Sequence, residues 1–311
     1  MSQNQGLDAI QVEMLKQVAD LHSMPEGAYS LRINGQLHGK NSSEHISIVK
    51  KEDAPGIDIF IAPGTKNESV HIPVLLSQTG LKELVYNDFH IGEGCDVTIV
   101  AGCGIHNGGS ETSEHSGIHR FFVGKGARIR YVEKHYGSGE GTGERVMNPT
   151  TEVFMEEDSY MEMETAQIKG VDSTNRRTIA KLADRATLIV HEKIMTHGTQ
   201  FAETYFEVDL DGEDCGTHVV SRSVAKENSR QTFISHVNGN NRSSGHTECD
   251  AIIMDSAHVV AIPEISANHT EASLIHEAAI GKIAGEQLIK LMTLGLTEKE
   301  AEEQIINGFL K

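Results

Sequence analysis

The sequence is poor in aromatic residues. It has no tryptophan, and aromatic residues make up 5% of its 311 positions. Enzymes that act on polysaccharides stack sugars on aromatic rings, so this scarcity argues against that class. No apolar run approaches the roughly 18 residues of a membrane span, and the N-terminus, MSQNQGLDAI, lacks the basic and apolar segments of a secretory signal. We therefore expect neither membrane insertion nor secretion.

Cysteine is also scarce, with four residues at irregular spacing. This pattern does not indicate a disulfide framework, and it fits a cytoplasmic protein whose thiols stay reduced and available as ligands.

Basic residues are too few for a nucleic-acid partner. There are 27 lysines and arginines against 45 acidic residues, a formal net charge of −18, whereas phosphate binding requires a basic face. Two glycine-rich stretches, 102–109 and 137–143, lack the Gly-Lys-Ser/Thr ending of a phosphate loop. We expect tight turns there and no bound nucleotide. No Gly-x-Ser-x-Gly or His-Glu-x-x-His motif is present, so we assign no catalytic residue.

The two ends of the chain have helical periodicity. Near the N-terminus, Leu7, Ile10 and Met14 begin an apolar stripe that stops before Pro25, which predicts a helical segment over residues 1–27. Beyond Pro263 the period returns, which predicts a helical segment over 266–311. Its apolar faces, which we expect to bind a partner, contain Leu288, Leu291, Met292, Ile305 and Phe309.

Between these ends, short strand-like stretches follow polar turns in a loose repeat. The repeats start 27 to 44 residues apart, at Ile91, Val123, Met155, Leu182, Leu210 and Met254. A single repeat cannot bury its own apolar face, so repeats of this kind stack into a solenoid. The pattern predicts a mainly β core over residues 28–265. The spacing alone fits a parallel β-helix and a β-sandwich of short hairpins equally well.

A candidate metal-ligand set lies near the C-terminus. Cys249, in a strand-like segment, and the adjacent pair His276 and Glu277 offer a thiolate, an imidazole and a carboxylate, which suit iron or zinc. The alternatives are a buried structural cysteine and a helix-entry cap for Glu277. His246 and Cys103 are weaker metal candidates. Cys103 belongs to a Cys-x2-His and His-x3-His pattern with His106, His115 and His119 that resembles zinc spacing, although chance spacings are common in a chain with 17 histidines.

Several stretches together resemble the SufB/SufD family of iron–sulfur cluster assembly proteins, in its short form. They are PEGAYSLRINGQ at Pro25, VAGCGIHNGG at Val100, SRSVAKENSRQ at Ser221, HTECDAIIMD at His246 and IHEAAIGKIAGEQLIKLMTLGL at Ile275. The resemblance implies a right-handed parallel β-helix with helical ends. It also implies a transient iron–sulfur cluster held by Cys249, His276 and Glu277, and an ABC-type ATPase of the SufC kind gripped by about residues 284–309.

The resemblance further implies a scaffold rather than an enzyme, with sulfur supplied by a cysteine desulfurase or a sulfur-transfer protein. Larger members have long N-terminal extensions and pair two different subunits, whereas this chain has no such extension, so we expect a homodimer. For the sulfur-accepting cysteine, Cys103 is a candidate only by its position in the core. The alternative function is a structural adaptor that seats the ATPase without binding a cluster.

Overall fold

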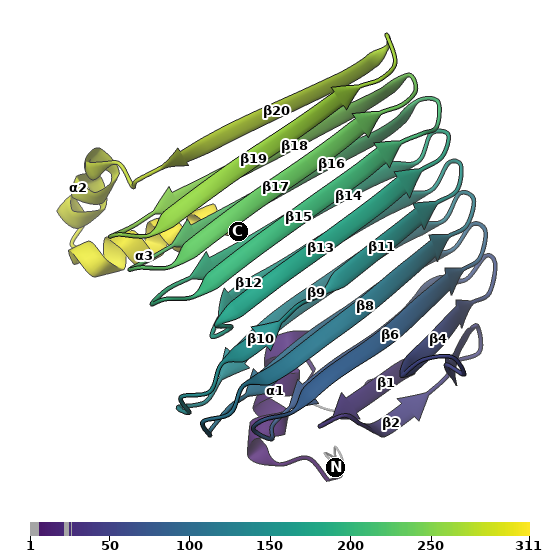
Figure 1. Cartoon of the computed structure of the whole chain (residues 1–311), viewed down its shortest axis with the longest axis horizontal. Helices are drawn as coiled ribbons and strands as arrows, with labels where there is room; N and C mark the ends of the chain where they lie inside the picture. Colours follow the sequence, from purple (N-terminus) through teal and green to yellow (C-terminus); the bar gives the residue numbers. More distant parts are fainter. Residues whose placement is uncertain (1–5, 22–24, 26) are drawn as a thin grey trace.

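The chain folds into a β-solenoid of about eight turns with short helices near both ends (Figure 1). The computed structural model describes residues 6–21, 25 and 27–311. Each turn adds one strand to each of two facing sheets, and successive strands within a sheet are parallel. This arrangement confirms the predicted parallel β-helix and excludes the sandwich of hairpins. Antiparallel pairing occurs at the N-terminal end of both sheets.

The first sheet contains, in spatial order, β2 (Gln36–Asn41), β1 (Ala28–Ile33), β5 (Lys66–Leu76), β7 (Asp96–His106), β9 (Arg128–Ser138), β12 (Tyr160–Lys169), β14 (Thr187–Thr196), β16 (Cys215–Ala225), β18 (Ser243–Ile253) and β20 (Ala272–Gly281). The second contains β19 (His258–Ala267), β17 (Arg230–Gly239), β15 (Phe201–Leu210), β13 (Ser173–Leu182), β10 (Arg145–Met147) with β11 (Thr150–Met155), β8 (Ser113–Val123), β6 (Lys82–Ile91), β4 (Gly56–Ile61) and β3 (Ile46–Lys50).

The strands form because apolar and polar residues alternate along them. In β14, for example, Leu188 and Val190 point inward and are fully buried, while their neighbours are half-exposed. Side chains on one strand alternate between the two faces of a sheet, so every second residue reaches the solenoid interior. These inward residues form one apolar core that extends from Ala28 to Cys249.

The repeat in the sequence corresponds to the corners of the solenoid. Backbone hydrogen bonds join successive corners, as in Gly124 N–H to the Ile91 carbonyl at 2.9 Å. Five of the six predicted starts lie at one corner. Met254 lies at the opposite corner, where its N–H bonds to the Ala225 carbonyl at 2.9 Å. The irregular spacing of 44 residues arose because the corner following Gly239 was overlooked.

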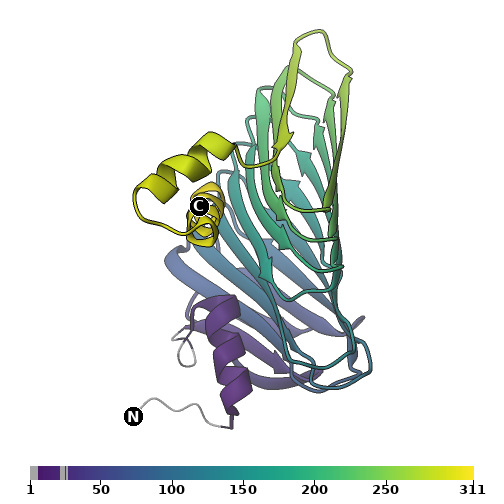
Figure 2. The same cartoon turned by 90° about the vertical axis from the view of Figure 1, so that its left-hand side faces the viewer.

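Helix α1 (Ala9–Ala19) covers the outer face of the first sheet near its N-terminal end (Figure 2). A Cβ atom at Gly102 would lie 2.2 Å from the Val18 carbonyl oxygen, so this close packing requires glycine. The helix is shorter than the segment predicted over 1–27, because Asp20 takes a left-handed conformation at φ 53° and ends it. Residues 1–5, 22–24 and 26 of that segment lie outside the described residues.

The solenoid extends further toward the C-terminus than expected. The boundary predicted at residue 265 falls inside β19, and β20 continues the first sheet to Gly281. Ten backbone positions of β20 pair with β18, and this tertiary pairing outweighs the local helical character of LIHEAAIG. The helices follow only then, as α2 (Gly285–Thr293) and α3 (Glu298–Phe309). No helix in the described part of the chain is long and apolar enough to cross a membrane.

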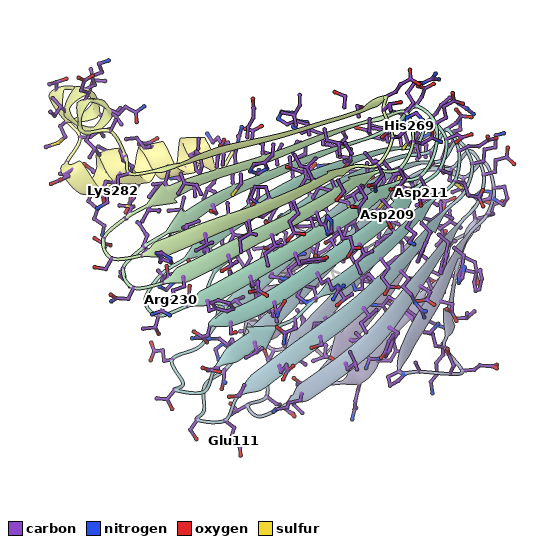
Figure 3. The ribbon with its side chains drawn as sticks, turned by 45° about the horizontal axis from the view of Figure 1, so that its top comes forward. Glu111, Asp209, Asp211, Arg230, His269 and Lys282 are labelled. Atoms are coloured by element: carbon purple, nitrogen blue, oxygen red, sulfur yellow. The ribbon has the colours of Figure 1, made fainter. Side chains whose placement is uncertain are left out.

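The C-terminal end of the solenoid is open. The turn at His269 and the exit at Lys282 lie at opposite ends of β20, which forms the rim together with β19 (Figure 3). Each of these strands has a strand partner on one side only. The helices α2 and α3 return along the outer face of the first sheet and leave the open end uncovered (Figure 2).

Candidate functional site

Cys249 lies on β18 and points into the solenoid, one turn below the open end. It is 1% exposed, and in the register of the sheet it lies beneath Ala278 of β20. Burial, with a smaller contribution from the carboxylate of Glu192, raises the pKa of the thiol to about 12. In this closed arrangement the sulfur is therefore a neutral thiol at pH 7.

The structure divides the predicted ligand set between the two faces of β20. His276 shares the inner face with Cys249, and its Nδ1 lies 2.7 Å from the hydroxyl of Thr247. Glu277 points to the outer face and is 65% exposed, with its Oε2 3.3 Å from Nε2 of His246. Cys249 and His276 thus share the inner face, whereas Glu277 lies beside the weaker candidate His246 on the outer face.

His246 belongs to a larger outer group that the sequence did not reveal. Its ring stacks on His218 of the preceding turn, with ring centroids 4.8 Å apart and an interplanar angle of 5°. The ligand atoms of His218, His246 and Glu248 all lie within 4.8 Å of one another. Burial and the neighbouring His246 lower the pKa of His218, which favours the neutral imidazole. The sequence signal that could have revealed this group is the separation of His218 and His246, which equals one turn of the solenoid.

A polar column crosses the interior toward Cys249. The register places inward-facing residues of successive turns above one another, in the order Glu133, Thr165, Glu192, Ser221 and Cys249. Glu192 accepts hydrogen bonds from Thr204 at 3.0 Å and from Ser221 at 2.8 Å. Sequence analysis missed this column, because single polar residues one turn apart do not form a local motif.

An arginine of the opposite sheet neutralises this column. Arg176 Nη1 donates to Glu133 Oε2 at 2.5 Å, and its Nε lies 3.6 Å from Glu192 Oε1. Burial alone would raise the pKa of Glu133, but Arg176 outweighs it and holds that pKa well below its usual range. For Glu192 burial dominates and raises the pKa. Removing one member of a buried ion pair typically costs about 3–5 kcal/mol, so this network constrains the interior strongly.

Cys103 lies near the N-terminal end of the same interior. Burial raises the pKa of its thiol, but the imidazoles of His115 and His135 outweigh that effect and lower it to about 7. Burial lowers the pKa of His115, and the thiolate of Cys103 together with Glu83 outweighs this and raises it to about 10. At pH 7 the His115 imidazole therefore carries a proton and the Cys103 thiol is partly ionised. Cys103 is the more readily ionised of the two candidate thiols.

The zinc-like pattern around Cys103 does not form a metal cluster. His119 Nδ1 lies 2.8 Å from the Tyr131 hydroxyl, and His106 Nδ1 lies 3.0 Å from the Ser138 hydroxyl, which takes both rings away from the sulfur. Among the described residues, Cys103 belongs to no group of three ligand atoms close enough to share an ion. A second such group, Asp58, Asp88 and His90, has its carboxylates occupied by Lys51 and Arg120.

A cavity of about 840 Å³ lies at a corner of the second sheet, and neither Cys103 nor Cys249 lines it. Its wall contains stacked rings from four turns, with centroids 4.6, 5.1 and 5.4 Å apart, from Phe60, His90, Phe122 and Phe154. Because the rings stack on one another, their faces are not free to hold sugars. The cavity therefore gives no support to a carbohydrate-acting enzyme.

The predicted partner-binding residues lie on two helices with different degrees of exposure. No residue of α2 is buried: Leu288 and Leu291 are half-buried and Met292 is exposed. On α3, Ile305 and Phe309 are half-buried, and the helix turns Ala301 and Ile306 inward. The structure also exposes two residues that sequence analysis overlooked, Ile289 at 62% and Leu294 at 80%. The free apolar surface of the tail is thus centred on α2.

Comparisons with known proteins agree on one family. Residues 84–309 match the description "SUF system FeS cluster assembly, SufBD core domain". The chain is 30% identical over 277 residues to an iron–sulfur cluster assembly SufBD family protein of Archaeoglobus fulgidus, a match that covers 88% of this chain and 72% of the relative.

Other relatives match over smaller shares. A SufBD family protein of Methanothermobacter thermautotrophicus is 30% identical over 224 residues, which cover 70% of this chain and 53% of that protein. The iron–sulfur cluster assembly protein SufB of Bacillus subtilis is 35% identical over 97 residues, which cover 30% of this chain and 21% of SufB. The chain therefore matches about half the length of the second relative.

The contrast between the two candidate thiols is testable by ultraviolet titration of thiolate in the folded protein. We expect one thiolate to form near pH 7 in the wild type, since the two imidazoles stabilise the ionised form of Cys103. Cys103→Ser should abolish this step and Cys249→Ser should leave it intact. A step that persists in Cys103→Ser, or that occurs only near the ordinary thiol pKa of about 8.5, would contradict the assignment.

Proposed function

This chain belongs to the SufB/SufD family of iron–sulfur cluster assembly proteins, and we propose that it is a scaffold subunit on which a transient cluster is built, not an enzyme. The observation that supports this most directly is the placement of Cys249 and His276 on the inner face of the last two strands of the first sheet, beside the open end. Glu277 lies on the same edge strand and can reach the rim from the outer face. The four free cysteines fit the reducing cytoplasm in which such a scaffold would work.

The proposed ligands differ in strength, and this suits a cluster that is built and then handed on. A thiolate binds iron tightly, while an imidazole and a carboxylate bind more weakly. Cys249 becomes accessible only if β20 shifts, since Ala278 covers it. Such a shift has a limited cost in free energy, because β20 is an edge strand of the first sheet. It would break backbone hydrogen bonds to one strand only, β18. Loss of the buried environment would also lower the thiol pKa toward its ordinary value.

Sulfur would come from a cysteine desulfurase or a sulfur-transfer protein. Cys103 is the proposed acceptor, because the thiolate is the nucleophilic form and this thiol has the lowered pKa. In the transfer the Cys103 thiolate forms a new S–S bond with the outer sulfur of the donor persulfide, and the donor leaves as a thiolate. Because Cys103 is buried, the donor requires an opening of the neighbouring turns.

A structural adaptor is the second candidate function, and one observation favours it. Cys249 is closed off from solvent and has a raised pKa, as an inert core thiol would. An adaptor would seat an ATPase without binding iron or sulfide.

Anaerobic reconstitution with iron and sulfide, followed by absorption spectroscopy, separates the scaffold from the adaptor. We expect a cluster spectrum in the wild type and its loss in Cys249→Ser, because the thiolate is the only strong ligand in the proposed set. Cys215→Ser is a matched control, since Cys215 is also buried in the first sheet with a raised pKa, but the register pairs it with Ser243 at the start of β18 and not with Cys249. An undiminished cluster in Cys249→Ser, or none in the wild type, would refute the scaffold proposal.

The proposed partner is an ABC-type ATPase of the SufC kind, bound through the C-terminal helices. Helix α2 is nine residues long, too short to be stable alone, and it buries none of its residues against this chain. An amphipathic helix in this state is suited to a groove on a partner, which reads residues at three- and four-residue steps. Helix α3 has a capping box from Thr297 and Glu300 and packs more closely, so it supports α2.

Charged substitutions on α2 and at Leu294, the residue that ends it, test this docking without disturbing the fold. Ile289→Asp with Leu294→Asp should abolish co-purification of the ATPase, because both side chains are exposed and an aspartate in an apolar groove loses its hydration. Leu37→Asp, an equivalent change of an exposed leucine on β2 at the opposite end, should have no effect. If the double variant keeps its ATPase with unchanged affinity, the docking role of α2 is wrong.

We further propose that two copies of the chain associate through the open end to form a homodimer. The inward-facing Ile265 and Ile280 are 44% and 39% exposed there, since no further turn covers them. The rim strands β19 and β20 also offer unpaired backbone groups, which commonly pair with another chain. Such a dimer would enclose both copies of Cys249 near its centre.

Light scattering during size-exclusion chromatography tests the dimer. Ile265→Asp with Ile280→Asp should convert a wild-type dimer into a monomer, because it places buried charges in the proposed interface. Ile168→Asp is a control of nearly equal exposure on β12, away from the open end, and should remain dimeric. A monomeric wild type, or a double variant that stays dimeric, would contradict the proposal.

A further inference from the structure

The outer face of the first sheet carries a donor set that the cluster ligands do not use. His218 of β16 and His246 of β18 are paired in the sheet register, so their side chains lie one turn apart on the same face. Glu248 follows two residues after His246 and points to the same side. The three ligand atoms lie within 4.8 Å of one another. Tetrahedral nitrogen ligands around one ion, at about 2.1 Å each, lie roughly 3.4 Å apart, so small side-chain rotations would close the site.

Within the described part of the chain, neither imidazole makes a hydrogen bond through its Nε2 atom, although His246 Nε2 lies 3.3 Å from Glu277 Oε2. The Nε2 atoms of His218 and His246 are both buried from solvent and have no hydrogen-bond partner among the described residues. Unsatisfied buried polar atoms are costly, and two such atoms beside one carboxylate indicate a missing ligand. Stacking of the two rings fixes their orientation, so both nitrogens are presented together.

The surroundings provide room and balanced charge. A cavity of about 450 Å³ lies over this face, and His218 and Glu248 line it together with His191 and Lys311 at the end of the chain. Arg222, Lys193 and Glu164 also line this cavity, so side chains of both charges face it. An ion with several bound water molecules fits such a volume.

We propose that His218, His246 and Glu248 bind a divalent first-row transition-metal ion, and that this ion is ferrous iron in the cell. Two imidazoles and one carboxylate with open coordination positions form the donor set that non-haem ferrous iron prefers. The absence of a thiolate separates this site from Cys249, which faces the opposite side of β18. Metal binding stands on the geometry of the outer face alone, whereas a role in loading iron rests on the proposed scaffold function.

The position of the site suits iron loading. Glu277, whose Oε2 lies 3.3 Å from His246 Nε2, connects the site to β20 at the rim. His276 is the next residue along the chain and points inward on that strand. An ion bound outside would thus lie beside Glu277, one residue along the chain from the inward-facing His276.

Titration of the cluster-free protein with Co²⁺ under anaerobic conditions tests the site, since Co²⁺ reports its ligands by absorption. We expect one ion to bind with a spectrum that lacks a thiolate charge-transfer band. His218→Ala with His246→Ala should weaken binding by on the order of 100-fold or more, because loss of even supporting groups costs 10–100-fold. Calorimetric titration with Fe²⁺ should rank the wild type and the variants by affinity in the same order. Circular dichroism checks that each variant is folded.

Two controls make the result specific. His236→Ala removes a half-exposed imidazole of the second sheet that also faces a carboxylate, Glu264 at 3.5 Å, and binding should be unchanged. Cys249→Ser should also bind Co²⁺ normally. No binding in the wild type, equal binding in the double histidine variant, or a thiolate band would overturn the proposal. Failure of cluster reconstitution with intact Co²⁺ binding would instead refute the scaffold function and leave the metal site standing.

Discussion

The parallel register between successive turns is the constraint on which the rest of the structure depends. Backbone hydrogen bonds hold neighbouring strands about 4.8 Å apart, so each side chain lies directly above one from the previous turn. Residues 28 or 29 positions apart in the sequence thereby become neighbours, as Ser221, Cys249 and Ala278 do on the inner face. Both the interior polar column and the outer histidine pair are products of this register.

The same register places charged residues in the solenoid interior. Burying an apolar column would cost less free energy, yet Glu133 and Glu192 both lie in the interior. Their carboxylates are paired with or hydrogen-bonded by Arg176, Thr204 and Ser221. Every charge in the column has a partner, so the network fixes the relative position of the two sheets. It also links the region of Cys103 with that of Cys249 by a continuous series of polar side chains.

The proposed cluster ligands lie near the open end, where the stacking of turns stops. In the middle of the solenoid each strand has two neighbours, and inward residues are sealed. At β19 and β20 one neighbour is missing, so apolar residues remain exposed and the ligand candidates lie close to the surface. The C-terminal helices lie along the side, where they can contact a partner without closing the rim. A scaffold needs this combination of rigid body and accessible edge.

The sequence by itself determined the fold class, the helical character of both ends and the family, because these depend on local periodicity and on contiguous motifs. It placed the corners at Ile91 through Leu210 but misplaced the C-terminal boundary, since ten pairing contacts with β18, and not local preference, make Ala272–Gly281 a strand. It also identified Cys249, His276, Glu277 and His246 as candidate ligands. Only the tertiary structure decided which of them lie on the same face of the sheet, because strand alternation places His276 inward and Glu277 outward. The pairing of His246 with His218, and of Glu133 with Arg176, likewise required the register between turns, which no local pattern specifies.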